Sequence, residues 1–426
     1  MNKLILSLII LIITYFLIFT NRRIRTTAAF FGAILTIALG LIQFEQAITY
    51  IDFNKLTIII GMMIFTIITK ESGIFQYLAI KATKYSKGNP LVLLISLSLL
   101  AGFLSSILDE IILLLFLANI TLAITNILEI SSVPFLISEI IFANIGGMAT
   151  YIGTPANIMI GSSAKLNFYD FIYHMAPISL ILIIISAFYL KNYFKEIFKK
   201  NNIPKEIISH FDKIDEKKAI TNLPLFKNSL LILTITIIVS FFSHLINLNL
   251  GIIYLLGAII LLFVSHDNPD KIYTQVDWKI IFFLIGLNIL AGTLEENGLI
   301  KIVSSKLLSF SGGNLNFLGF SILGLSTFMS SFFDNIPIIA LAIPILKNIS
   351  YHLGPNLNML WWALVLGANI GANGTLIGTA SNLIVADIAD KNKQPIPFWY
   401  FVKVAFPLVI LNLIVASIYI YWRYLV

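Results

Sequence analysis

The chain has 426 residues, of which 58% are apolar and only 12% are charged. Soluble globular proteins carry about 25% charged residues, so this composition excludes a water-soluble domain and predicts a polytopic membrane protein. The net charge of +7 lies in short gaps between apolar runs, which argues against a nucleic-acid-binding surface. The sequence has no cysteine, which excludes disulfides, thiolate metal sites and cysteine nucleophiles.

Apolar runs long enough to cross a membrane lie along the whole chain. The simple spans are at 4–20, 26–43, 57–69, 171–190, 229–246, 251–265, 280–293 and 399–422. Two longer runs, 90–126 and 315–347, are interrupted midway by charged residues, and we expect helical hairpins there. Two others, 133–165 and 358–388, are interrupted by Gly, Asn and Thr and predict broken helices. Irregular backbone in a bilayer needs protein or a wet cavity around it.

The longest polar stretch, 191–228, has nine lysines against five acidic residues, which predicts a cytoplasmic linker. If the hairpins enter and leave on one side and the broken helices cross, the turn at Arg22 to Arg25 lies on the same side as this linker. Both chain termini then lie outside, and we expect a multi-pass protein of the inner cell membrane. Full crossings by both arms of each hairpin would give the same parity, so re-entrance stays open.

An internal repeat divides the chain at a constant offset of 225 residues. The offset aligns Asp109 with Asp334 and the run 143–158 with 368–383, where nine of sixteen positions are identical. The sequence therefore predicts two repeats, 1–190 and 229–426, each with five membrane helices, one of them broken, and a re-entrant hairpin. Five crossings is an odd number, so the repeats would run in opposite directions, as in secondary transporters with a site near the midplane.

The two broken segments carry groups that bind small cations. Hydroxyls, amide oxygens and free backbone carbonyls are hard ligands for Na⁺, and half-helix N-termini favour anions. The alternative is that the small residues only allow helices to pack closely, as small-xxx-small motifs do. The presence of two copies at one offset favours a site.

Two carboxylates, Asp109 and Asp334, interrupt the hairpins, and neither 91–164 nor 310–346 contains a Lys, Arg or His. A carboxylate inside a membrane is a functional candidate by default. Each carboxylate must therefore be protonated, bind a cation or pair with a basic residue from elsewhere in the chain. The alternative to a functional role is that each is a protonated carboxyl that only caps the hairpin tip. Glu110 aligns with Asn335, which makes Glu110 the better candidate for proton coupling.

The paired Asn-Ile-Gly passages and Ser-Ser-x-x-Asp hairpins resemble the ion transporter superfamily, in particular its arsenite permease and NhaD-type sodium/proton antiporter branch. The resemblance covers the whole chain. It implies a homodimer, a scaffold, and a transport domain that moves like an elevator. It also implies that these residues line the site: Asp109, Asn144, Thr150, Thr154, Asn157, Asp334, Asn335, Asn369, Thr375, Thr379 and Asn382.

The sequence departs from this pattern at Glu110, where antiporter-like members commonly have Asn. We expect a Na⁺/H⁺ antiporter without other cofactors, with Na⁺ held at Asp109, Asn157, Asp334 or Asn382. The alternative is a permease for arsenite, another oxyanion or a dicarboxylate, coupled to H⁺ or Na⁺. The Ser-Asn-Thr tips of dicarboxylate carriers are absent, so that substrate ranks lower. An enzyme is disfavoured because common catalytic motifs are missing, and a static channel is a remote alternative.

Overall fold

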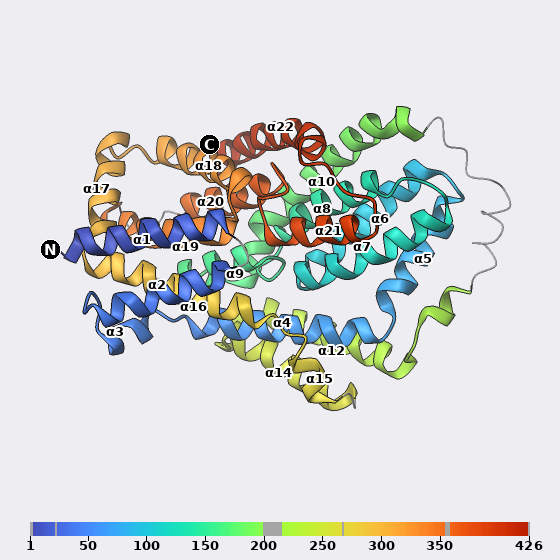
Figure 1. The fold of residues 1–426 in the computed structure, drawn as a ribbon, viewed down its shortest axis with the longest axis horizontal. Helices are drawn as coiled ribbons and strands as arrows, with labels where there is room; N and C mark the ends of the chain where they lie inside the picture. The colour runs from blue at the N-terminus through green and yellow to red at the C-terminus, as the bar shows by residue number, and fades with distance from the viewer. Residues whose placement is uncertain (1–2, 22–23, 199–214, 266–267, 354–357, 425–426) are drawn as a thin grey trace.

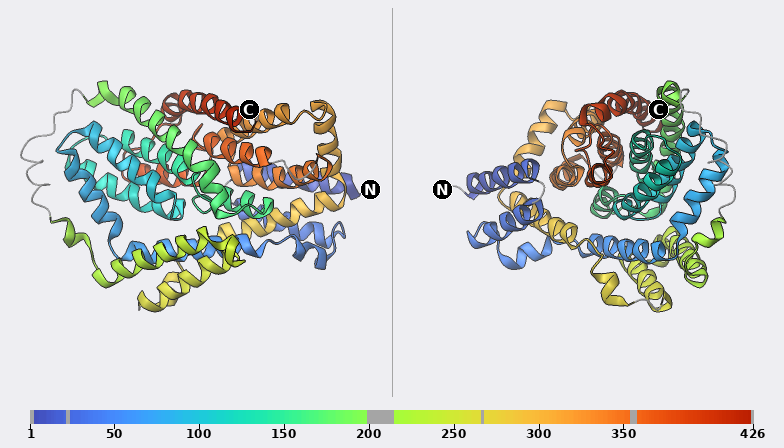
Figure 2. Two further views of the ribbon diagram at one scale, coloured as in Figure 1. Left: turned by 180° about the vertical axis from the view of Figure 1, so that it is seen from behind. Right: turned by 45° about the vertical axis from the view of Figure 1, so that its right-hand side comes forward.

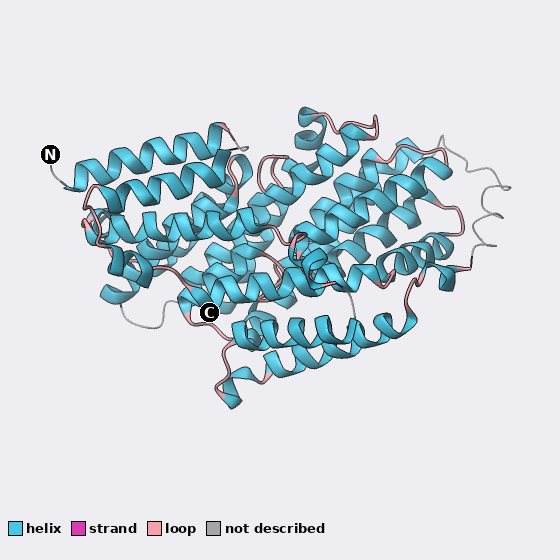
Figure 3. Ribbon diagram, turned by 60° about the horizontal axis from the view of Figure 1, so that its bottom comes forward, coloured by secondary structure: helices cyan, strands magenta, loops and turns pink. Residues whose placement is uncertain are grey.

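The computed structural model describes residues 3–21, 24–198, 215–265, 268–353 and 358–424. Within these ranges the chain forms helices and loops and no strand (Figure 3). In the described part of the chain, eight helices are long and apolar enough to cross a membrane. The predicted all-α polytopic membrane fold is thereby confirmed.

The first half of the described chain contains ten helices. In chain order they are α1 Lys3–Thr20, α2 Arg25–Ala38, α3 Phe44–Thr49, α4 Phe53–Glu71, α5 Ile74–Ser86, α6 Pro90–Ser105, α7 Glu110–Ile127, α8 Val133–Gly147, α9 Pro155–Ala164 and α10 Phe168–Phe198.

A short 3₁₀ helix, η2 (Glu216–Ala219), precedes the second half. The helices that follow are α12 Leu223–Phe241, α13 Ser243–Ile246, α14 Leu250–Ser265, α15 Pro269–Tyr273, α16 Trp278–Glu296, α17 Leu299–Ser311, α18 Leu315–Phe332, α19 Asn335–Leu353, α20 Asn358–Ala372, α21 Ala380–Lys391 and α22 Phe398–Tyr424.

Several helix bounds recur at the offset of 225 residues. Shifting α4, α5 and α8 by 225 gives the bounds of α16, α17 and α20. The hairpin helices α6 and α7 likewise fall on α18 and α19, with ends that differ by at most two residues. The opposite orientation of the two halves in the membrane stays a prediction, as does re-entrance. Both α7 and α18 are long and apolar enough to cross.

Several helices differ in extent from the predicted spans. α2 ends at Ala38 rather than at 43, because Gly40 adopts a positive φ of 67° and turns the chain. α10 continues to Phe198 and α12 begins at Leu223, so both enter the predicted linker 191–228. Burial of Phe194 and Phe198 extends the apolar face of α10. Residues 199–214 of this linker, and Arg22 and Arg23, lie outside the described residues.

Two groups of helices position the site. We call α1, α2, α4, α12, α14 and α16 the scaffold, and we call the hairpins and broken helices, α6 to α9 and α18 to α21, the core. In the scaffold, α4 packs against α14, α2 against α16 and α12 against α14. In the core, each hairpin packs against a broken helix, α6 on α8 and α18 on α20. Figure 1 shows α4, α12 and α14 along the lower edge, α22 along the upper edge, and α10 running from the centre toward the upper right. The right-hand view of Figure 2 shows the core as a bundle above α4 and α14.

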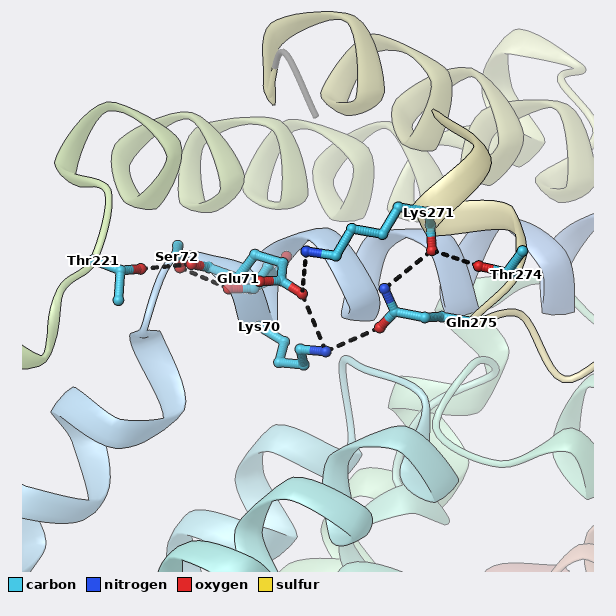
Figure 4. Close-up of polar contacts among 8 residues, drawn as sticks. Lys70, Glu71, Ser72, Thr221, Lys271, Thr274 and Gln275 are labelled. Carbon is cyan, nitrogen blue, oxygen red and sulfur yellow. Dashed lines mark hydrogen bonds and ion pairs between the residues drawn. The ribbon is translucent and has the colours of Figure 1, made fainter. Parts of the chain in front are cut away.

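A polar cluster at the end of α4 fastens the scaffold together (Figure 4). The Glu71 carboxylate lies 3.2 Å from the Lys70 ammonium and 3.8 Å from that of Lys271. Lys70 also donates to the side-chain oxygen of Gln275 at 3.0 Å, and the Thr221 hydroxyl donates to the Glu71 carbonyl at 2.6 Å. These contacts tie α4 to α15 and to the segment that leads into α12.

Candidate functional site

Each half of the core contains a helix that stops and restarts. α8 and α9 are separated by residues 148–154, and α20 and α21 by residues 373–379. Thr154 and Thr379 have extended backbones where the second pieces begin. Pro155 follows Thr154 and has no N–H to donate, so it can begin a helix but interrupts a continuous one. The breaks leave backbone groups without helical partners inside the protein.

Two glycines let the broken helices lie directly against the hairpins. A Cβ at Gly146 would collide with the carbonyl oxygen of Gly102, and a Cβ at Gly371 would collide with that of Thr327. These positions are related by the offset of 225. For these two glycines, therefore, the close-packing interpretation holds, and the ligand-like groups of the site are the side chains around them.

Four asparagines connect the two broken helices in a reciprocal pattern. Asn144 donates to the side-chain oxygen of Asn382 at 3.1 Å, and Asn369 donates to that of Asn157 at 2.9 Å. Asn144 is the counterpart of Asn369, and Asn157 is the counterpart of Asn382, at the offset of 225. The end of each first piece therefore bonds to the start of the second piece from the other half. All four side chains are buried.

The same asparagines hold the breaks open by bonding their backbone carbonyls. The Asn157 amide donates to the carbonyls of Gly147 at 3.0 Å and Thr150 at 2.7 Å. In the second half, the Asn382 amide donates to the carbonyl of Thr375 at 3.2 Å. Buried backbone carbonyls need such partners, and the two amides supply them in both breaks.

Threonines in the breaks fasten the hairpin tips to the broken helices. The Thr150 hydroxyl donates to the carbonyl of Ser106 at 2.5 Å, and the Thr375 hydroxyl donates to that of Ser331 at 2.6 Å. Ser106 and Ser331 stand at equivalent places before the two aspartates. Each hairpin tip is thus bonded to the break in its own half.

The first hairpin tip carries two buried carboxylates that serve different contacts. Asp109 is 5% exposed and caps α7, since its carboxylate accepts from the backbone N–H of Ile112 at 2.9 Å. Its own N–H donates to the Thr66 hydroxyl at 3.1 Å. Glu110 is 3% exposed and accepts from the Ser381 hydroxyl of α21 at 2.6 Å. Asp109 therefore caps the helix at the hairpin tip, as one interpretation of the sequence predicted. Glu110 instead contacts a residue of the second half of the molecule.

The second hairpin tip finds a distant cation. Asp334 accepts from the backbone N–H of Ile336 at 3.1 Å, and its other oxygen lies 2.8 Å from the guanidinium of Arg25. Among the three ways in which this aspartate could be accommodated, the structure shows the distant partner. The next residue, Asn335, donates its backbone N–H to the carbonyl of Gly378 at 3.3 Å, across the second break.

All twelve predicted site residues are buried in the core. They are Asp109, Glu110, Asn144, Thr150, Thr154, Asn157, Asp334, Asn335, Asn369, Thr375, Thr379 and Asn382. Thr154 also joins the asparagines, since its hydroxyl lies 3.3 Å from the side-chain oxygen of Asn369. Hairpin tips and breaks therefore form one connected polar region, with the asparagines at its centre.

This region also contains residues that were not predicted as site residues. Asn373 accepts from Asn144 at 2.9 Å, Ser381 bonds Glu110, and Arg25 pairs with Asp334. None of them has a polar counterpart at the offset of 225, where the chain has Met148, Ala156 and Leu250. The repeat, which pointed to the other residues, could not indicate these.

A cavity of about 480 Å³ lies between the scaffold and the core. The cavity is lined in part by charged and polar residues at the start of α4 and on α9, α16 and α19, among them Asp52, Lys55, Ser163, Asn288, Glu295 and Lys347. Ala340 of α19 also lines it, only a few residues beyond the second hairpin tip. The cavity therefore extends along the boundary between the two groups.

Membrane-crossing helices with paired breaks and an oxygen-rich crossing point define a membrane transporter. The sequence profile of the family described as "Citrate transporter" matches residues 15–367 and, in a second match, residues 289–425. The chain belongs to this citrate transporter family, which confirms the resemblance to ion transporters that the motifs indicated.

Relatives of known sequence agree with this assignment. A 46 kDa membrane protein of Mycobacterium leprae is 31% identical over 99% of both chains, and an uncharacterized transporter of Mycobacterium tuberculosis is 32% identical over 99% of both. The P protein of Homo sapiens is 30% identical over 93% of this chain and 57% of its own length. Among solved structures, the YdaH transporter of Alcanivorax borkumensis has the same fold, with a TM-score of 0.51 and 10% identity over 86% of this chain and 85% of that one.

Proposed function

We propose that this transporter is a secondary antiporter that exchanges a small cation, Na⁺ first among them, for protons. One observation carries the proposal. Three buried carboxylates, Asp109, Glu110 and Asp334, reach the hairpin tips, and within the described residues only Asp334 forms an ion pair with a cation. The region therefore has more negative than positive charge, and oxygen ligands that suit Na⁺ surround it.

The contacts of Asp109 and Glu110 favour different roles for the two carboxylates. Asp109 has one oxygen committed to the cap of α7, so it suits a fixed cation ligand. Glu110 bonds a hydroxyl of the other half, and a hydroxyl can accept from the protonated acid or donate to the carboxylate. Glu110 is therefore our candidate for the group that exchanges a proton for the cation.

Alternating access would come from movement of the core against the scaffold. Hairpins and broken helices contact one another closely, whereas the cavity of about 480 Å³ separates α16 from part of α19. A core that moves as one unit carries its site from one side to the other, as an elevator does. The homodimer that the resemblance implies would hold the scaffold still.

A second candidate is an anion permease coupled to Na⁺ or H⁺, for arsenite, another oxyanion or a carboxylate. It is favoured by the guanidinium of Arg25 at the second tip and by the description of the family. Sequence alone had favoured a cation because the hairpins and breaks contain no basic residue. Arg25 weakens that reason, since the fold brings a cation to them from elsewhere.

Thermal unfolding of the purified protein separates the two candidates. A ligand that binds only the folded state stabilises it by about 2.7 kcal/mol at one hundred times its Kd. We expect Na⁺ or Li⁺ to raise the unfolding temperature at constant ionic strength, with choline as the control. A shift produced only by arsenite, phosphate or carboxylates would support the permease and contradict antiport.

A further inference from the structure

The pair between Arg25 and Asp334 joins the two groups of helices. Arg25 begins α2, which packs against α1 and α16 of the scaffold. Asp334 stands between α18 and α19 of the core. Their side chains are 18% and 8% exposed. Because the partners belong to different groups, the core cannot move far from the scaffold while this pair persists.

Other contacts concentrate at the same place. The rings of Phe19 and Phe333 lie 4.5 Å apart between their centroids, and the Tyr15 hydroxyl donates to the carbonyl of Pro337 at 3.0 Å. On the scaffold side, the Arg25 guanidinium lies 5.3 Å from the ring centroid of Phe283 on α16. The end of α1 and the start of α2 thus receive the second hairpin tip.

A small cavity reaches the ion pair. It has a volume of about 90 Å³, and both Arg25 and Asp334 line it. A water molecule occupies about 30 Å³ in the liquid, so the cavity has room for a few waters. A partly hydrated small cation can therefore approach the Asp334 carboxylate when the guanidinium leaves it.

Among the residues that the structure describes, the first half has no equivalent of this pair. Leu250 occupies the position of Arg25 at the offset of 225. The Asp109 carboxylate accepts from the backbone N–H of Ile112, and the backbone N–H of Asp109 donates to the Thr66 hydroxyl. Within the described residues, Asp109 forms no ion pair with a basic side chain. The two aspartates are thus equivalent in sequence and differ in charge compensation.

We propose that Arg25 is the resident counter-ion of Asp334, and that a transported cation at Asp334 and contact of the second hairpin with Arg25 exclude each other. Occupation by both would place two positive charges beside one carboxylate. The inference rests on the proposed cation transport. We call the state in which the second hairpin contacts Arg25 the docked state. In it, only Asp109 of the two aspartates is available to a cation, and cation binding at Asp334 releases the core from the scaffold.

The first test compares the Na⁺ dependence of thermal unfolding in variants of Arg25. If the docked state is populated at about 90%, the apparent affinity is reduced about tenfold, so Arg25→Gln should lower the half-saturating Na⁺ concentration about tenfold. Asp334→Asn added to this variant should remove the gain, and Arg25→Lys should restore most of the wild-type value. Lys70→Gln is the matched control, because Lys70 is a scaffold cation that contacts the core at the Phe116 ring, 4.2 Å away.

The second test keeps the ion pair and follows the docking itself. The chain has no cysteine, so Cys residues replacing Phe19 and Phe333 are the only thiols, and a short bifunctional thiol reagent can join them. We expect the cross-linking yield to fall several-fold as Na⁺ rises, and not to fall when Asp334→Asn is added.

The outcomes separate the two proposals. Suppose that Na⁺ stabilises the wild type, but Arg25→Gln has the same half-saturating Na⁺ concentration or the cross-linking yield is independent of Na⁺. The proposed role of Arg25 is then wrong, and the proposal of cation binding stands. If no cation stabilises the wild type or any variant, the proposed function is wrong, and the counter-ion role is overturned with it.

Discussion

At the scale of single residues, the crossed asparagines hold the centre of the core together. Asn369 donates to Asn157, and the hydroxyl of Thr154 lies 3.3 Å from its oxygen. We expect Asn369→Ala to destabilise the protein by about 1–3 kcal/mol, because it leaves buried polar atoms without partners. Thermal unfolding measures this. Asn119→Ala is the control, since exposed Asn119 donates to the carbonyl of Leu115 in its own helix. An equal loss of stability there would contradict this role of Asn369.

The role of Glu110 can be separated from its structural contact. In Glu110→Gln the amide oxygen can still accept from Ser381, but the proton that the acid exchanges is lost. We expect the variant to fold normally, and its half-saturating Na⁺ concentration to be independent of pH. In the wild type it should fall as pH rises, because protons and Na⁺ compete. The exposed carboxylate of Asp387 on α21 provides the control variant, Asp387→Asn. A pH dependence that survives Glu110→Gln would assign the proton to another group.

The contribution of Asp52, at the edge of the scaffold, to the stability of the protein should depend on pH. Burial alone would raise the pKa of its carboxyl, but Lys55 and the Ser162 hydroxyl outweigh burial and hold the pKa below its ordinary value. A carboxyl with a lowered folded pKa stabilises the protein above its unfolded pKa, and this contribution is lost as pH falls through the folded one. The stability difference between wild type and Asp52→Asn should therefore be about 1–3 kcal/mol at neutral pH and shrink below about pH 4. A difference that grows on acidification would contradict the sign.

At the scale of elements, the contact between hairpin and broken helix depends on a glycine. We expect Gly146→Ala to reduce the amount of folded protein severely, by about 3 kcal/mol or more of stability, because its methyl group would collide with backbone of α6 that cannot rotate away. Gly324→Ala is a matched control within helix α18. A Cβ at Gly324 meets no atom within 4 Å, so alanine there should be neutral or stabilising by up to about 1 kcal/mol. Detergent extraction with size-exclusion profiles compares the two, and equal profiles would refute the close approach.

The helices themselves were largely predictable from the sequence. Long apolar runs indicated where most helices lie, and the offset of 225 matched α4 to α16 and α8 to α20. Helix ends were harder. The turn at Gly40 and the buried phenylalanines at the end of α10 depend on the local backbone and on tertiary packing. Hydropathy alone reports neither of these.

At the scale of the whole molecule, the contacts between the two halves were not predictable. The motif asparagines were recognised because they occur twice, but no pattern indicated that Asn144 bonds Asn382 rather than a residue of its own half. Arg25 was assigned to a basic turn that orients the chain. Its pairing with Asp334 spans 309 residues of sequence, so only the folded chain reveals it. Ser381 has no polar counterpart in the first half, so the internal repeat could not indicate it.

Transport in proteoliposomes tests most directly whether the carboxylates of the core exchange a small cation for protons. Vesicles that contain the purified protein and a pH-sensitive dye are prepared with an acidic interior, and Na⁺, Li⁺ or K⁺ is then added outside. We predict that Na⁺ or Li⁺ dissipates the proton gradient in the wild type, and that Asp334→Asn, although folded, behaves like protein-free vesicles. A gradient that persists in the wild type with all three cations would contradict the account.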